Sequence, residues 1–133
     1  MKKIFLMVML CTISAAAISQ RYYKIHANTI GVWNTYSQSY DWGTRRYVEM
    51  ELTMKGKIIL ISDDAGSAYV TGRQVLNEDK SEYQQYMWEA VDEKQRNCNI
   101  KILSPKINGQ VTGACQLYIF YNDYAYEYDV TFE

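Results

Sequence analysis

The sequence has few of the residues on which most catalytic centres depend. Its 133 residues include a single histidine, His26, near the start of the chain. Serine–histidine and cysteine–histidine arrangements therefore lack a well-placed base, and we expect His26 to be a surface side chain. Basic residues are not in surplus either, because 14 lysines and arginines stand against 15 acidic residues. Since phosphate binding needs a basic surplus, we expect no nucleic-acid partner.

Motifs for metals and phosphates are also missing. Cys98 and Cys115 form no C-x-x-C unit of the kind that holds zinc. The seven glycines are scattered along the chain and form no phosphate-binding loop. Asp63, Asp64 and Ser67 offer oxygens for Ca²⁺, yet acidic turns are common for backbone reasons alone. We therefore predict no metal site and no cofactor.

The first 19 residues have the pattern of a secretory signal peptide. Lys2 and Lys3 precede an apolar run from Ile4 to Ile13, and small residues dominate 14–19. The apolar run has about half of the roughly 20 residues that a membrane-spanning helix needs. We therefore expect residues 1–19 to be removed, which leaves one domain, 20–133, without a membrane span. This domain would be exported to the periplasm or to the cell surface.

Beyond residue 19, alternating apolar and polar side chains predict β-strands. From Arg46 to Met54 every second residue is apolar, which is typical of a half-buried strand. Gly56 can adopt the positive φ of a tight turn into the next apolar segment, Ile58–Ile61. The other segments with a strand pattern are 29–33, 67–76, 98–102, 116–121 and 124–132. Residues 20–27 have no such pattern, and we expect a loose start there.

These segments predict an all-β domain, a small antiparallel barrel or sandwich of about 7–8 strands built from hairpins. One segment is ambiguous. From Ser81 to Val91 apolar side chains fall at helical spacing, which favours one short helix near 82–94. A strand at the same place would instead pair with 98–102 in a hairpin. The local pattern leaves both alternatives open.

Three short motifs resemble small exported proteins of gut Bacteroidota. The motifs are W-x-A-x-D at Trp88–Asp92, C-x-I-x-I at Cys98–Ile102, and QLYI-x-Y-x-D at 116–123. The similarity extends over much of the chain after the predicted signal peptide. It implies a strand-rich domain and favours a strand over a helix at 82–94. It implies no activity and no site residues.

Cys98 and Cys115 both lie on the apolar side of their segments. In one hairpin register, with Ile102 opposite Val111, the two cysteines face each other. A bridge there would close a loop of about 18 residues and stabilise the fold by roughly 3 kcal/mol. In the other register, 116–121 pairs along 98–103 and the cysteines lie at opposite strand ends. Because exported proteins meet an oxidising compartment, we favour the Cys98–Cys115 disulfide.

Aromatic residues provide the main functional signal. The segment 33–43 reads WNTYSQSYDWG, in which rings alternate with small polar side chains. Such composition is typical of recognition loops, and flat rings beside polar groups suit sugar faces. The alternative is a connection, partly strand, whose rings cover the open end of the sheet. On 116–121, two further rings point away from the core side. The candidate binding residues are Trp33, Tyr36, Tyr40, Trp42, Tyr118 and Phe120.

Three functions are compatible with these features. The leading interpretation is an exported, non-catalytic binding module whose rings contact a glycan or a protein surface. The second is a small barrel that carries an apolar ligand, with the tyrosine face of 124–132 lining a void of ~300 Å³ or more. The third is a hydrolase with paired carboxylates. Its candidate pairs are Glu49 with Glu51 and Glu127 with Asp129. Since a solvent-facing strand side explains both pairs, we expect no enzyme.

Overall fold

The computed structural model describes residues 20–62 and 66–132. Residues 1–19, with the predicted signal peptide, and Asp63 and Asp64 of the calcium alternative lie outside the described residues. The described chain forms ten strands: β1 (Arg21–Asn34), β2 (Ser39–Trp42), β3 (Arg46–Lys55), β4 (Ile58–Ile61), β5 (Ser67–Asp79), β6 (Tyr83–Asp92), β7 (Asn97–Ile107), β8 (Gln110–Val111), β9 (Ala114–Phe120) and β10 (Tyr124–Phe132). Within these ranges no helix is long and apolar enough to cross a membrane.

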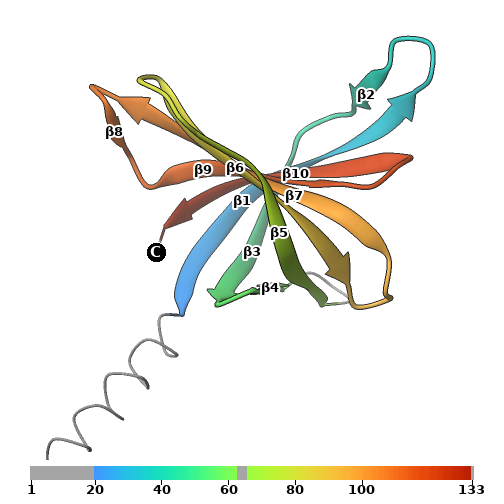
Figure 1. Cartoon of the computed structure of the whole chain (residues 1–133), viewed down its shortest axis with the longest axis horizontal. Helices are drawn as coiled ribbons and strands as arrows, with labels where there is room; N and C mark the ends of the chain where they lie inside the picture. The colour runs from blue at the N-terminus through green and yellow to red at the C-terminus, as the bar shows by residue number, and fades with distance from the viewer. Residues whose placement is uncertain (1–19, 63–65, 133) are drawn as a thin grey trace, which may run out of the picture.

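Eight of the strands form a closed antiparallel barrel. The hydrogen-bonded order is β10-β9-β7-β6-β5-β4-β3-β1, and β1 pairs with β10 to close the ring. β2 is added to β1, and β8 to β7. Figure 1 shows the β1–β2 hairpin projecting beyond the crossing strands, away from β8. The prediction of an all-β antiparallel fold is confirmed, and the architecture is a barrel.

The hydrophobic core lies midway along the barrel. Ile100, Leu117 and Ile119 are completely buried, and Ile25 and Leu52 are only 1% exposed. The residues directly before and after these on the same strands face outward, as the alternating pattern predicted. Eight strands enclose an interior that side chains of this size fill, so the middle of the barrel is solid.

A β-bulge in β1 reverses which residues face inward, so the two halves of the strand have opposite alternation. Ile25 pairs with Val130, whereas Ala27 pairs with Asp129, so His26 is the extra residue. The inward-facing positions are odd-numbered before the bulge and even-numbered after it. The second half of β1 therefore turns its odd-numbered residues to the outer surface.

Two sequence alternatives are resolved by strand pairing. The alternative of a short helix near 82–94 is wrong, because β6 pairs along most of its length with β5 and β7. The loose start predicted for 20–27 is also wrong, because β3 and β10 pair with β1 from its first residues. His26 consequently lies on a strand, where its Nε2 is 2.6 Å from Oγ1 of Thr131.

The predicted disulfide is also wrong, since Cys98 and Cys115 are both free thiols. β9 pairs with β7 in the second of the two registers, with Phe120 opposite Asn99. This register puts the cysteines at opposite ends of the pair, on the order of 20 Å apart at about 3.3 Å per residue. A disulfide needs Cα atoms within about 7 Å of each other.

Candidate functional site

Five of the six predicted binding residues come together on the outer surface of the barrel. The rings of Trp33, Tyr40, Trp42, Tyr118 and Phe120 form a chain of contacts with centroid distances from 5.0 to 6.0 Å. We call these five residues the aromatic patch. They come from the β1–β2 hairpin and from β9, which lies more than 70 residues further along the chain.

The sixth predicted residue, Tyr36, is 98% exposed at the tip of the β1–β2 hairpin. The predicted recognition loop is itself this hairpin, with Trp33 paired to Tyr40. Its turn is held by the Asn34 side chain, whose Oδ1 accepts hydrogen bonds from the amides of Tyr36 (2.9 Å) and Ser37 (3.2 Å). The segment is therefore strand at 33–34 and 39–42, with a turn at 35–38. This agrees with the partly stranded alternative, except that the rings lie on the outer surface of the barrel and not over an open end.

Two small residues form the floor of the aromatic patch. A Cβ added to Gly31 would lie 2.9 Å from Cε3 of Trp42, so the indole rests directly on the β1 backbone. Ala125 of β10 pairs with Phe120 on one side and Gly31 on the other, and it is completely buried although it points outward. The small side chains allow the β2 rings to reach across β1 and β10 to the rings of β9.

Hydrogen bonds hold the hairpin against the barrel. The amide of Trp33 donates to the carbonyl of Asp123 at 2.9 Å. The hydroxyl of Tyr40 donates to the carbonyl of Tyr121. Burial raises the pKa of Tyr40, and the nearby charge of Asp123 raises it further, so this hydroxyl stays a donor. The patch is therefore positioned before any ligand arrives.

Charged groups border the rings of β9. Nζ of Lys101 lies 4.7 Å from the ring centroid of Tyr118 and 5.7 Å from that of Phe120, whose planes differ by only 2°. Burial raises the pKa of Tyr118, and so does a hydrogen bond to Glu127. Trp42 is the most accessible ring of the patch, with 41% of its surface exposed. The arrangement can stack against a flat partner and hydrogen-bond its edge.

The carboxylate pairs are engaged in other contacts or exposed. Glu127 accepts from Tyr118, and Asp129 forms an ion pair with Arg45. Glu49 and Glu51 are exposed on β3. In residues 20–62 and 66–132, no group of three His, Cys, Asp or Glu side chains could hold a metal ion. The contacts and exposure of these carboxylates do not support the hydrolase alternative.

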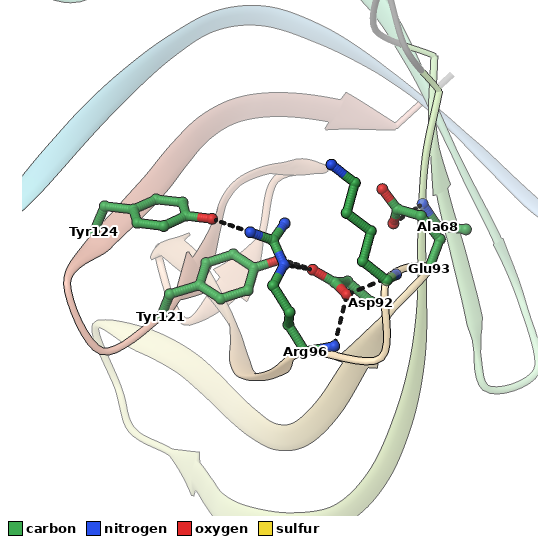
Figure 2. Close-up of polar contacts among 7 residues, drawn as sticks. Ala68, Asp92, Glu93, Arg96, Tyr121 and Tyr124 are labelled. Carbon is green, nitrogen blue, oxygen red and sulfur yellow. Dashed lines mark hydrogen bonds and ion pairs between the residues drawn. The ribbon is translucent and has the colours of Figure 1, made fainter.

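Figure 2 shows a network of polar contacts around Asp92 at one end of the barrel. The sequence pattern did not predict this network. The Asp92 side chain is 1% exposed and accepts hydrogen bonds from the amides of Lys94 and Arg96, both at 2.9 Å. It also accepts from Nε of Arg96 at 2.8 Å and from the hydroxyl of Tyr121 at 2.7 Å. Nη1 of Arg96 then donates to the hydroxyl of Tyr124 at 2.9 Å.

This network fixes the charge of Asp92. Burial raises the pKa of its carboxyl, but the donors from Arg96, Tyr121 and Lys94 outweigh burial and bring the pKa to about 2. The network ties the β6–β7 turn to β9 and β10. One sequence signal could have revealed it, because Asp92 continues the inward-facing, even-numbered positions of β6.

Each end of the barrel opens into a cavity. The first, which we call the polar mouth, has a volume of about 550 Å³ and is bordered by charged residues, among them Arg46 and Arg96, and by tyrosines. Tyr126 and Tyr128 line it, as the carrier interpretation expected, whereas Tyr124 stacks on Tyr121 at 4.8 Å. The second, the apolar mouth, has a volume of about 510 Å³.

Comparison of the chain with known protein families, with functionally described proteins and with solved structures finds no match. The resemblance to small exported proteins of gut Bacteroidota therefore stays a prediction.

Proposed function

We propose that the protein is an exported, non-catalytic binding module that holds a glycan on its aromatic patch. The observation that supports the proposal is the assembly of five rings from separate strands on a floor of Gly31 and Ala125. Side chains that served only the core would have no reason to gather on the outside of a barrel whose interior is already filled.

The accessible area favours a sugar over a protein partner. The patch rings cover one another, and only Trp42 is more than about a third exposed. A stable protein interface needs roughly 800 Å² on each partner, which is far more than a few half-buried rings offer. One or two sugar rings match the patch better, because an indole face stacks on their C–H groups while polar side chains bond their hydroxyls.

Polar groups of the right kind lie beside the rings. Lys101 and Glu127 flank Tyr118 with opposite charges. Export rests on the signal-peptide pattern of residues 1–19.

A glycan array tests the proposal, followed by titration of the best glycan into wild-type protein and two variants. Trp42→Ala removes the most accessible ring of the patch and should weaken binding by about tenfold or more, as for a central stacking residue. Tyr22→Ala is the matched control, because Tyr22 is 52% exposed and does not belong to the patch. This control should bind like wild type.

The array has two informative results. Binding that depends on Trp42 but not on Tyr22 supports the proposal. Glycan binding that survives Trp42→Ala, or an array without any bound glycan, contradicts it. In the second case the protein-surface partner becomes the alternative to test.

A further inference from the structure

The apolar mouth lies at the end of the barrel away from the Asp92 network. Its volume of about 510 Å³ falls within the range of roughly 300–1,000 Å³ that small-molecule sites occupy. Most of the lining comes from alternate, inward-facing positions of the barrel strands. The main contributors are Tyr23, Met54, Trp88, Ile102, Cys115 and Phe132.

The cavity ends inside the barrel. Tyr23, Met54, Ile102 and Cys115 pack against the hydrophobic core. Further along, the core is closed by residues such as Ile100, which is completely buried. The apolar mouth is therefore a blind pocket that opens at the barrel end.

The walls are aromatic and aliphatic. Tyr23 and Phe132 meet edge to face with ring centroids 5.4 Å apart, and Tyr86 lies beside Trp88 at 5.9 Å. Phe132 is 58% exposed at the entrance, where its ring is accessible to an apolar ligand. An apolar chain would find favourable contacts with these side chains.

Among residues 20–62 and 66–132, one charged residue lines the pocket. Arg21 lies at the entrance, where the other polar lining residues, Gln74, Gln84 and Ser104, are uncharged. The polar mouth, by contrast, is lined by both acids and bases. A lone guanidinium beside an apolar pocket complements a carboxylate, with which it can form two parallel hydrogen bonds.

We propose that the apolar mouth binds a medium-chain carboxylic acid, with the alkyl chain against Trp88 and Ile102 and the carboxylate at Arg21. This site is separate from the aromatic patch and uses none of its residues. It retains the idea of an apolar carrier and places the ligand at the end opposite to the tyrosine face of β10.

The alkylation rate of Cys115 can measure ligand binding in the apolar mouth, because Cys115 lines this pocket. Burial raises its pKa to about 11, so alkylation is slow and is best measured near pH 8.5 with excess iodoacetamide. The full-length protein is alkylated with and without decanoate, and peptides are quantified by mass spectrometry. At about ten times the dissociation constant, decanoate should slow alkylation of Cys115 by roughly tenfold.

Cys98 is the internal control, since it lies at the other end of the β7–β9 pair and does not line the apolar mouth. Its alkylation rate should not change. The proposal is overturned if decanoate fails to protect Cys115, or if it slows both thiols equally. Trp42→Ala should leave the protection intact, so failure of the glycan proposal would not affect this test.

The role of the carboxylate is tested with decanol and with Arg21→Gln. Decanol should protect Cys115 at least about tenfold less well than decanoate at equal concentration, because it cannot pair with the guanidinium. Arg21→Gln should remove that difference. Arg73→Gln is the matched control, because Arg73 pairs with Glu89 on the exposed surface and is 76% exposed. Equal protection by acid and alcohol in the wild type contradicts the proposed ligand class.

Discussion

The indole of Trp42 lies against the backbone of Gly31, so close that a Cβ at position 31 would come within 2.9 Å of Cε3. This contact couples the β1–β2 hairpin to the barrel. It also sets the distance of the Trp42 ring from the β1 backbone, so the geometry of the aromatic patch depends on the absence of a side chain at position 31.

Gly31→Ala should displace the Trp42 indole. Because the methyl group would meet a ring that is also held by Tyr40 and Tyr118, we expect a loss of about 1–2 kcal/mol in unfolding free energy. Urea unfolding measures the loss, and tryptophan emission reports the displaced ring. Gly72→Ala is the control, since its Cβ would be 3.5 Å from the nearest atom, an ordinary contact. Equal stability of the two variants would contradict the contact.

Asp92→Asn should be the most damaging single polar substitution in the network. It removes the charge and replaces Oδ2, which accepts from Nε of Arg96 and from the Tyr121 hydroxyl, with an NH2 donor, and we expect a loss of about 2–3 kcal/mol at pH 7. Asp41→Asn, on an exposed carboxylate with one hydrogen bond, should cost no more than about 0.5 kcal/mol. Denaturant unfolding of both variants checks the difference.

The pH dependence of the Asp92 contribution has a definite sign. The pKa of about 2 in the folded protein is lower than the value of about 3.9 in an unfolded chain. The stabilisation is therefore complete above about pH 4 and is lost as the pH falls through 2. The stability difference between wild type and Asp92→Asn should be constant from pH 7 to 5 and should narrow between pH 4 and 2. A difference that widens in acid would contradict this assignment.

Reductant should not change the stability of the folded protein. Cys98 and Cys115 are free and lie at opposite ends of the β7–β9 pair. The melting temperature should be the same with and without dithiothreitol, whereas a native bridge would contribute about 3 kcal/mol. Burial raises the pKa of both thiols to about 11, so both should react slowly at neutral pH and quickly after unfolding. Thiol titration in denaturant provides the control.

Tyr40→Phe should loosen the hairpin without removing a ring. The variant loses the hydrogen bond from the hydroxyl to the carbonyl of Tyr121 and should cost about 1 kcal/mol. Tyr36→Phe is the matched control, because Tyr36 is 98% exposed and should tolerate the change. Hydrogen exchange of the β2 amides should rise in the first variant only.

Local alternation predicted most strands because each of the eight barrel strands has one face inside the barrel. The segments 46–54, 58–61 and 124–132 therefore correspond closely to β3, β4 and β10. Closure could not be predicted in the same way. The pairing of β1 with β10 joins Tyr23 to Phe132 across almost the whole chain, and no local pattern encodes it.

The errors have local physical causes. β1 was underestimated because the bulge at His26 shifts the alternation by one residue, so its two halves have opposite patterns. The disulfide was predicted from the compartment, whereas the register of β9 on β7 decides it. The burial of Asp92 could not be predicted from local sequence, because it depends on donors from the following turn and from Tyr121, which directly follows β9.

The aromatic patch was largely predictable from residue type. Tyr118 and Phe120 fall on the side of β9 opposite to the buried Leu117, which marked them as outward-facing rings. The sequence could not show that the rings of β2 reach them, since this depends on Gly31 and Ala125 lying between. Tyr36 could not be separated from the others, because the position of the hairpin turn was unknown.

The most direct test of the glycan proposal follows the three indole N–H signals in a two-dimensional ¹⁵N NMR spectrum. Trp33 and Trp42 belong to the aromatic patch and Trp88 to the apolar mouth, so the signals report on two separate sites. Tryptophan-to-phenylalanine variants assign them. Titration with the best glycan from the array should shift the Trp42 signal and leave Trp88 unchanged. A shift of Trp88 alone, or of no signal at saturating glycan, would contradict the account.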